Sequence, residues 1–345
     1  MQATGAVLRF HFVLDPGATH WDDIDSLGED DIARSPGRFV GGRNSWIAQT
    51  YVRLRRAIQA RGWKATAGDG FPPGAICVAH RDDVNGFALA AHGSFLLVVR
   101  ADRAPVAACD MAIIQNRLAA EPHERFVPLW PQPGLLPRSE ERGARIERMA
   151  YLGRTSSAPG WFGDPSFHAA LSRRGVAFEI RTRSWEDYRG VDLALATRRE
   201  LDHVLARKPA TKLYNAWLAG VPALASAEPA YADLRRSRLD FIEVRGPAEV
   251  LGGIDALRAD PGLYRAMVEN GRRRGTEFTV DAVRGRWMAL LEKEVVPRFL
   301  AARPAIASRA GWFARAMALQ KARSRVDRVR RGLESWKRAV RPVSG

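Results

Sequence analysis

The sequence predicts an α/β protein built from two doubly wound, Rossmann-like domains that face a cleft. Three observations lead to this prediction. The length of 345 residues corresponds to about two domains of ordinary size. Short, continuously apolar segments alternate with segments of helical spacing, a pattern typical of parallel sheets with helices on both faces. A proline-rich stretch at 127–137 shows no periodicity and separates two such series.

The first domain is predicted to span residues 1–137. A segment rich in β-branched and aromatic residues at 7–14 indicates its first strand. Apolar residues from Trp46 to Ile58 then follow helical spacing, and Gly62 ends that helix. Shorter apolar runs predict further strands at 75–79, 95–99 and 111–114.

The second domain is predicted to span residues 138–300. Its strands are expected at 148–152, 176–181, 191–196, 221–225 and 240–244. Its helices are expected at 167–174, 212–219, 247–257 and 261–274, and again from 280 onward. Because open parallel sheets bind ligands at the carboxyl ends of their strands, the ligand is expected in the cleft between the domains.

The net charge of +16 is concentrated in a predicted third segment, residues 301–345. That segment holds twelve lysines and arginines against two acidic residues, which gives +10. The first 300 residues hold 42 basic and 36 acidic groups, which gives +6. An anionic partner is therefore expected at this tail before any other part of the chain.

The tail has the spacing of a basic amphipathic helix. Apolar residues recur every seven positions, and three more fall three positions after the middle ones: Trp312, Leu319, Val326, Leu333 and Val340, then Ala322, Val329 and Trp336. Our main hypothesis is that this helix lies on an anionic membrane surface. Two alternatives are that it pairs with a partner helix or packs back on the first domain. No recognised nucleic-acid module is present, so nucleic acid is not an expected partner.

Two motifs in the second half resemble a known family. The segment from Lys208 to Ser226, KPATKLYNAWLAGVPALAS, resembles the nucleotide-sugar-binding segment of GT-B glycosyltransferases, a helix of the form K-L-x-E-A-x-A-x-G-x-P followed by a strand. The segment YLGR, ending at Arg154, looks like the G-R turn that opens the second domain of that fold. The proline-rich stretch matches the link between its domains. The resemblance covers 148–290 well and the first 145 residues in outline.

This resemblance implies an enzyme that moves a sugar from a nucleotide-diphosphate donor to a hydroxyl of a glycan or lipid-linked acceptor. The donor is a substrate, and no further cofactor is expected. A diphosphate needs cations and backbone N–H donors, so Arg154, Lys208 and Lys212 are expected to hold it. Thr211 is expected to cap the helix whose first-turn amides face the ligand. Asn215 is expected near the ribose.

The first domain is expected to supply the acceptor site. Gly41 and Gly42 resemble the glycine loop of the family and let a ligand approach a helix N-terminus closely. They do not match G-x-G-x-x-G, which argues against a nicotinamide cofactor. His80 follows a predicted strand and is the candidate base for the acceptor hydroxyl. Asp102 follows another and is expected to line the cleft. No essential metal is expected, because the D-x-D spacing at 23–25 lies in a loop-like run.

One departure from the family leaves the chemistry open. The retaining branch carries two glutamates eight positions apart, and the corresponding residues here are Arg207 and Asn215. Asn215 can still hydrogen-bond a ribose hydroxyl, whereas an arginine cannot support the sugar as a glutamate does. Two other functions therefore remain alternatives: a catalytically inactive GT-B scaffold that binds partners or membrane, and a nucleotide-sugar epimerase. The first residues lack a secretory signal, so we expect a cytoplasmic protein, peripheral on the inner face of the membrane.

Overall fold

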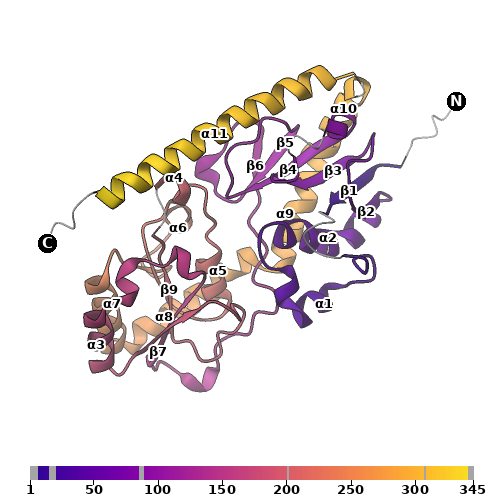
Figure 1. Cartoon of the computed structure of the whole chain (residues 1–345). Helices are drawn as coiled ribbons and strands as arrows, with labels where there is room; N and C mark the ends of the chain where they lie inside the picture. The colour runs from indigo at the N-terminus through magenta and orange to yellow at the C-terminus, as the bar shows by residue number, and fades with distance from the viewer. Residues whose placement is uncertain (1–6, 15–20, 85–88, 200–201, 307, 341–345) are drawn as a thin grey trace.

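The computed structural model describes residues 7–14, 21–84, 89–199, 202–306 and 308–340 and contains two parallel sheets (Figure 1). The first sheet has the order β2-β1-β3-β4-β5-β6, with every neighbouring pair parallel. Its strands are β1 (Arg9–Val13), β2 (Lys64–Gly68), β3 (Ile76–His80), β4 (Phe95–Ala101), β5 (Met111–Ile114) and β6 (Glu124–Phe126). Since β3 and β4 are buried along their whole length, they appear in the sequence as continuous apolar runs.

The second sheet repeats this winding with five parallel strands in the order β11-β10-β9-β7-β8. Its strands are β7 (Arg148–Leu152), β8 (Ala177–Arg181), β9 (Leu193–Ala196), β10 (Ala223–Ala225) and β11 (Ile242–Glu243). In each sheet the first strand lies between the second and the third. The chain therefore reverses direction across the sheet between β1 and β3 and between β7 and β9, and these are the points where open α/β sheets bind ligands. The predicted two-domain, doubly wound fold is confirmed.

The described part of the second domain contains six α-helices. They are α3 (Pro165–Arg173), α4 (Asp202–Leu205), α5 (Thr211–Leu218), α6 (Pro229–Leu234), α7 (Pro247–Ala259) and α8 (Pro261–Gly275). Helix α5 is buried along one side through Leu213, Tyr214 and Trp217. The ring of Phe278 stacks on Tyr214 with centroids 4.6 Å apart. This packing fixes the direction of α5 and so places its N-terminus at the edge of the sheet where β7 and β9 end.

One face of the first sheet is covered by helices from both ends of the chain. They are α1 (Glu29–Arg34), α2 (Gln49–Gln59), which continues a π-helical turn at Asn44–Ala48, and then α9 (Val280–Leu290) and α10 (Val296–Ile306). Trp287 and Phe299 share a single buried cluster with Tyr51 and Leu97. The stretch 280–300, placed by the sequence analysis in the second domain, therefore packs on the first.

Helix α11 (Ala310–Val340) covers the opposite face of the first sheet. Phe313, Ala316 and Met317 are buried against residues of β3 and β4 such as Cys77 and Leu96. Among the described residues, the connections from β3 to β6 contain only short 3-10 helices, at Leu89–Gly93 and Arg117–Ala119. The C-terminal helix thus fills the place that crossover helices take in a doubly wound sheet. The alternative that the tail packs back on the first domain therefore holds for the N-terminal part of α11, around Phe313 and Met317.

The predicted apolar seam faces outward instead. The exposed fractions of Val326, Val329 and Leu333 are 68%, 60% and 54%, and Leu319 is also exposed. The side chains of Trp336 and Val340, predicted to continue the seam, lie outside the described residues, as do residues 341–345. No helix among the described residues has both the length and the apolar character that a bilayer span requires.

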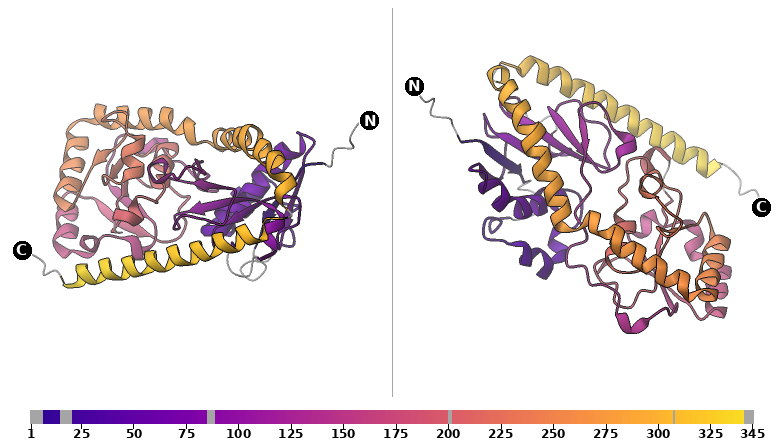
Figure 2. Two further views of the ribbon diagram at one scale, coloured as in Figure 1. Left: turned by 90° about the horizontal axis from the view of Figure 1, so that it is seen from above. Right: turned by 180° about the vertical axis from the view of Figure 1, so that it is seen from behind.

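Helix α11 also reaches the second domain, as both views in Figure 2 show. Arg81 after β3 donates from Nη2 to Oγ of Ser324 at 2.7 Å. One turn further along, Asp327 accepts from Nη2 of Arg207 in the second domain at 3.0 Å. A single helix therefore ties both domains together along one side of the cleft.

Candidate functional site

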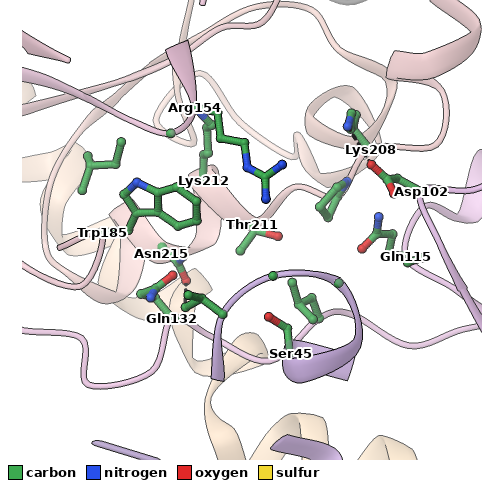
Figure 3. A pocket seen from close by; sticks show the side chains of 18 of the residues that line it. Ser45, Asp102, Gln115, Gln132, Arg154, Trp185, Lys208, Thr211, Lys212 and Asn215 are labelled. Carbon is green, nitrogen blue, oxygen red and sulfur yellow. Dashed lines mark hydrogen bonds and ion pairs between the residues drawn. The ribbon is translucent and has the colours of Figure 1, made fainter. Parts of the chain in front are cut away.

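The carboxyl ends of the two sheets enclose a cleft of about 400 Å³. All nine residues that the sequence analysis nominated line it: Gly41, Gly42, His80, Asp102, Arg154, Lys208, Thr211, Lys212 and Asn215. Figure 3 shows Arg154, Lys208, Thr211, Lys212 and Asn215 among them. Arg154 reaches into the middle of the pocket, Trp185 lies near Lys212 on one side, and Lys208 lies with Asp102 on the other.

Lys212 is held at the end of β7 by an aromatic ring. Its Nζ lies 3.4 Å from the centroid of the Tyr151 ring, a close cation–π contact. A Cβ atom on Gly153 would lie 2.5 Å from the same Nζ and 3.1 Å from the Tyr151 ring. Glycine at 153 therefore leaves the space in which the ammonium group lies, beside Arg154.

Arg198 is a cleft residue that the sequence analysis missed. It follows β9, the neighbour of β7, so it lies across the switch point from Arg154. Its guanidinium is ion-paired with the buried carboxylate of Glu228, and its Nη2 donates to the carbonyl of Pro209 at 3.2 Å. Glu228 also accepts from Oγ of Ser226 at 2.9 Å. A charged residue directly after a predicted strand was the signal that could have found Arg198.

The N-terminus of α5 faces the cleft, but its cap differs from the prediction. The N-cap is Ala210 and Thr211 is the first helical residue, so the predicted capping role of Thr211 is wrong. Its hydroxyl instead accepts from the phenol of Tyr214 at 3.2 Å. The first intrahelical bond runs from the amide of Leu213 to the carbonyl of Ala210. The amide of Thr211 precedes this bond at the start of the helix, where a backbone N–H is suited to an anion.

A second helix N-terminus enters the cleft from the first domain. Gly41 has φ of +87°, a conformation that glycine adopts without strain. The helix then begins, and its first bond runs from the amide of Ser45 to the carbonyl of Gly41 at 2.9 Å. Two helix N-termini, one from each domain, thus border the same cleft.

His80 lies at the end of β3 and is 1% exposed. Burial lowers its pKa to about 4, against a smaller opposing effect of Asp82. Its Nδ1 accepts from the backbone amide of Asp82 at 3.2 Å. The neutral ring therefore carries its proton on Nε2. This atom faces Gly42, since a Cβ atom built on Gly42 would lie 3.9 Å from it. In this state His80 is a hydrogen-bond donor toward the glycine loop.

An ion pair joins the two domains across the cleft. Nζ of Lys208 lies 2.7 Å from Oδ2 of Asp102. Burial alone would raise the pKa of Asp102, but Lys208 and Arg103 outweigh it and hold the pKa below its ordinary value. Asp102 is therefore ionised at neutral pH, and its carboxylate lines the cleft.

Arg207 and Asn215, the two positions that depart from the family pattern, lie in different surroundings. Asn215 lines the cleft, is buried, and accepts from the amide of Gln132 at 3.1 Å. Arg207 is not among the residues that line the cleft, since its guanidinium bonds to Asp327 of α11. The described residues contain no group of three or more histidine, cysteine or acidic side chains placed to hold a metal ion.

Solved structures share this architecture. Anabaena HepE in complex with UDP-glucose is 10% identical, with a TM-score of 0.51, and the match covers 83% of this chain and all of that one. Sucrose-phosphate synthase from Thermosynechococcus elongatus is 11% identical, also with a TM-score of 0.51, and the match covers 84% of this chain and all of that one. No family model matches the sequence, and the search of curated proteins finds no match. The chain has the GT-B fold that the resemblance implied.

Proposed function

We propose that this protein is a glycosyltransferase that moves a sugar from a nucleotide-diphosphate donor to a hydroxyl of a glycan or lipid-linked acceptor. One observation carries the proposal: the cations Arg154 and Lys212 and the N-terminus of α5 converge on the cleft at the switch point of the second sheet. The solved structure of HepE with UDP-glucose, which has the same fold, supports a sugar nucleotide as the ligand.

The donor would lie against the second domain. Lys212 and the first amides of α5 would bind one phosphate, and Arg154, which extends into the open part of the pocket, would bind the other (Figure 3). Asn215 would face the ribose from the second turn of α5. Lys208 would complete the positive border on the side of the first domain.

This arrangement suits the chemistry of glycosyl transfer. When the bond between the sugar and the phosphate breaks, negative charge grows on the departing diphosphate. Cations and N–H groups that are already in place stabilise that charge without having to reorganise. The two domains would bring donor and acceptor together and exclude water as the cleft closes.

The acceptor hydroxyl must lose its proton. His80 is the candidate base from the sequence, but its Nδ1 already accepts from the amide of Asp82, and the proton on Nε2 makes it a hydrogen-bond donor to the glycine loop or the acceptor. Asp102 is ionised and lines the cleft from the first domain, so we assign it as the better candidate base.

The outer face of α11 supports a place for the protein at the membrane. Val326, Val329 and Leu333 form an exposed apolar stripe on a helix that carries many arginines, while its inner face packs on the protein. A stripe of this kind lies favourably on anionic lipid. We therefore place the protein in the cytoplasm, peripheral on the inner face of the membrane. Pairing with a partner helix is the alternative.

Donor turnover tests the proposed activity and separates it from the alternatives. The purified protein would be incubated with UDP-, GDP- and ADP-sugars, with and without glycan and lipid-linked acceptors, and release of the nucleoside diphosphate measured. Release that requires an acceptor supports a glycosyltransferase. A new sugar isomer formed without acceptor would indicate an epimerase. Nucleotide binding without any turnover would indicate an inactive scaffold.

A further inference from the structure

A second cavity, of about 380 Å³, lies between the two domains and α11. We call it the α11 cavity. Its walls come from the loops after β3 and β4, from the segment after α4, and from the side of α11 around Ser324 and Asp327. Asp102, Arg103 and Lys208 line both this cavity and the donor cleft. The interdomain ion pair therefore forms a wall common to the two spaces.

The α11 cavity has more positive than negative charge. Five cations and three carboxylates line it: Arg81, Arg103, Arg207, Lys208 and Arg328, with Asp82, Asp102 and Asp327. Each carboxylate is already paired, at 2.9 Å between Arg103 and Asp82, 2.7 Å between Lys208 and Asp102, and 3.0 Å between Arg207 and Asp327. In the described part of the chain, Arg81 and Arg328 have no carboxylate within ion-pair distance.

Arg81 is the more informative of these two cations, because it is partly buried. Its Nη2 donates to Oγ of Ser324 at 2.7 Å, and its Nε is buried with no hydrogen-bond acceptor among the described residues. Burial lowers the pKa of Arg81 even though the carboxylates of Asp82 and Asp327 oppose this effect, so a bound anion would offset a desolvation cost that these carboxylates leave in place. A guanidinium also presents parallel N–H groups that match the oxygens of a phosphate.

We propose that the α11 cavity binds the phosphate group of a phosphate ester carried by the acceptor. This inference rests on the proposed function, because it names the class of acceptor for that same cleft. Arg81 and Arg328 would bind the phosphate oxygens. Since Asp102 and Lys208 line both spaces, a phosphate bound on one side of their ion pair places the rest of the acceptor beside the donor on the other. The phosphate ester is either lipid-borne or soluble.

The test uses the full-length protein, with the donor cleft first saturated with UDP. Glycerol 3-phosphate would be titrated by calorimetry into the wild type and into Arg81→Gln, Arg328→Gln and Arg323→Gln. Arg323 is an exposed arginine on α11 that does not line the cavity, so it is the matched control. We expect binding to weaken about tenfold or more in the first two variants, because each loses charged hydrogen bonds to the phosphate. We expect no change in the control.

A second arm distinguishes the two sources of the phosphate. Vesicles of phosphatidylcholine containing phosphatidic acid would be compared with vesicles containing the same fraction of phosphatidylglycerol, whose phosphate is a diester. If binding to phosphatidic acid vesicles depends on Arg81 and binding to glycerol 3-phosphate does not, the phosphate is lipid-borne. Dependence in both arms indicates that a soluble phosphate ester is sufficient. Either result supports the α11 cavity as the binding site.

Equal affinity of the wild type and both cavity variants for these probes, or no binding of either probe, would overturn the inference. If Arg81→Gln fails to fold, Arg328→Gln decides, because Arg328 is exposed. UDP binding is measured in the same preparations. If UDP does not bind the wild type, the proposed function fails by itself, and the titrations without UDP still compare Arg81→Gln with the control.

Discussion

Lys208 of the second domain and Asp102 of the first form an ion pair of 2.7 Å across the cleft. This pair holds a cation at the border of the proposed donor site and keeps a carboxylate ionised beside it. Both side chains also line the α11 cavity. Because the pair joins the two domains, the charge beside the proposed donor site depends on how the domains are placed relative to each other.

Replacement of Asp102 by asparagine should strengthen nucleotide binding. The substitution removes a negative charge beside the proposed diphosphate site and leaves Lys208 without its carboxylate partner, so the affinity for UDP should rise severalfold. Both side chains are partly exposed, so the free energy of unfolding should change by less than about 1 kcal/mol. Calorimetry at low and high salt checks this, since the gain should shrink as salt rises. Weaker UDP binding in Asp102→Asn would contradict the placement of the diphosphate.

Replacement of Gly153 by alanine should weaken nucleotide binding without removing any charge. The new Cβ would lie 2.5 Å from Nζ of Lys212, so the ammonium must leave its place over the Tyr151 ring. The protein should stay folded, because the end of the lysine side chain can move and the Tyr151 ring, 3.1 Å from the new Cβ, need shift by only about a few tenths of an ångström. Gly160→Ala is the control, because a Cβ there meets no atom within 4 Å. Titration with UDP measures the effect, and equal affinities of the two variants would show that the position of Lys212 does not matter.

The buried histidine should make folding sensitive to acid. Burial lowers the pKa of His80 from 6.5 to about 4, so between these values the unfolded chain binds more protons than the folded one. Stability is therefore complete above pH 6.5 and falls as the pH drops toward 4, by up to about 3 kcal/mol. His80→Asn should lack this part of the loss.

Urea denaturation at several pH values between 4 and 7 measures the effect. The stability advantage of the wild type over His80→Asn should shrink steadily as the pH falls. The exposed His168, whose Nε2 bonds to the carbonyl of Phe162 at 2.7 Å, provides the comparison, since His168→Asn should keep the acid-dependent loss that His80 causes. A constant difference between the wild type and His80→Asn across this range would mean that His80 is not buried in its neutral form.

The exposed stripe of α11 should be needed for membrane binding and not for folding. Substitution of Val326, Val329 and Leu333 by serine removes the apolar surface that would enter the lipid interface. The melting temperature should stay within about 2 °C of the wild type, because these side chains are exposed. Cosedimentation would use phosphatidylcholine vesicles with about one third phosphatidylglycerol. Binding to these vesicles by the wild type and its loss in the variant are expected; equal binding of both would exclude this stripe as the contact.

In the first sheet, the interior strands were predictable from the sequence and the edge strands were not. Strands β1, β3, β4 and β5 lie inside the first sheet, where burial on both faces requires apolar residues. Strands β2 and β6 lie at its two edges and have the sequences KATAG and ERF. One side of an edge strand is unpaired and less buried, so its residues are not constrained to be apolar.

The surfaces on which the last helices pack could not be predicted from the sequence either. Helical spacing from Val280 onward shows that one side of each helix is buried, but it does not show which sheet the helix covers. In α11 the apolar seam does not mark the docked side, because that side contains Gln320, which donates to the carbonyl of Val84, and Ser324. A docked face built partly from hydrogen bonds leaves no apolar stripe to find.

The lining of the cleft was easier to predict from the sequence than the outer parts of the fold. The nominated residues all line the cleft because their motifs directly follow strands or begin helices, and the carboxyl ends of parallel strands meet at one edge. Arg198 was missed because its position depends on the buried Glu228, thirty residues later in the chain. The pairing of Arg207 with Asp327 was missed because no predicted place for α11 put it against the second domain.

The most direct test of the account is the affinity of the cleft for nucleotides. Calorimetry would compare UDP, GDP, ADP and CMP on the wild type, on Lys212→Ala, and on Lys293→Ala, which removes an exposed lysine far from the cleft. We predict that one nucleoside diphosphate binds, that Lys212→Ala weakens it about tenfold or more, and that Lys293→Ala does not. No binding of any nucleotide to the folded wild type, or equal affinities of the two variants, would contradict a nucleotide-diphosphate site in this cleft.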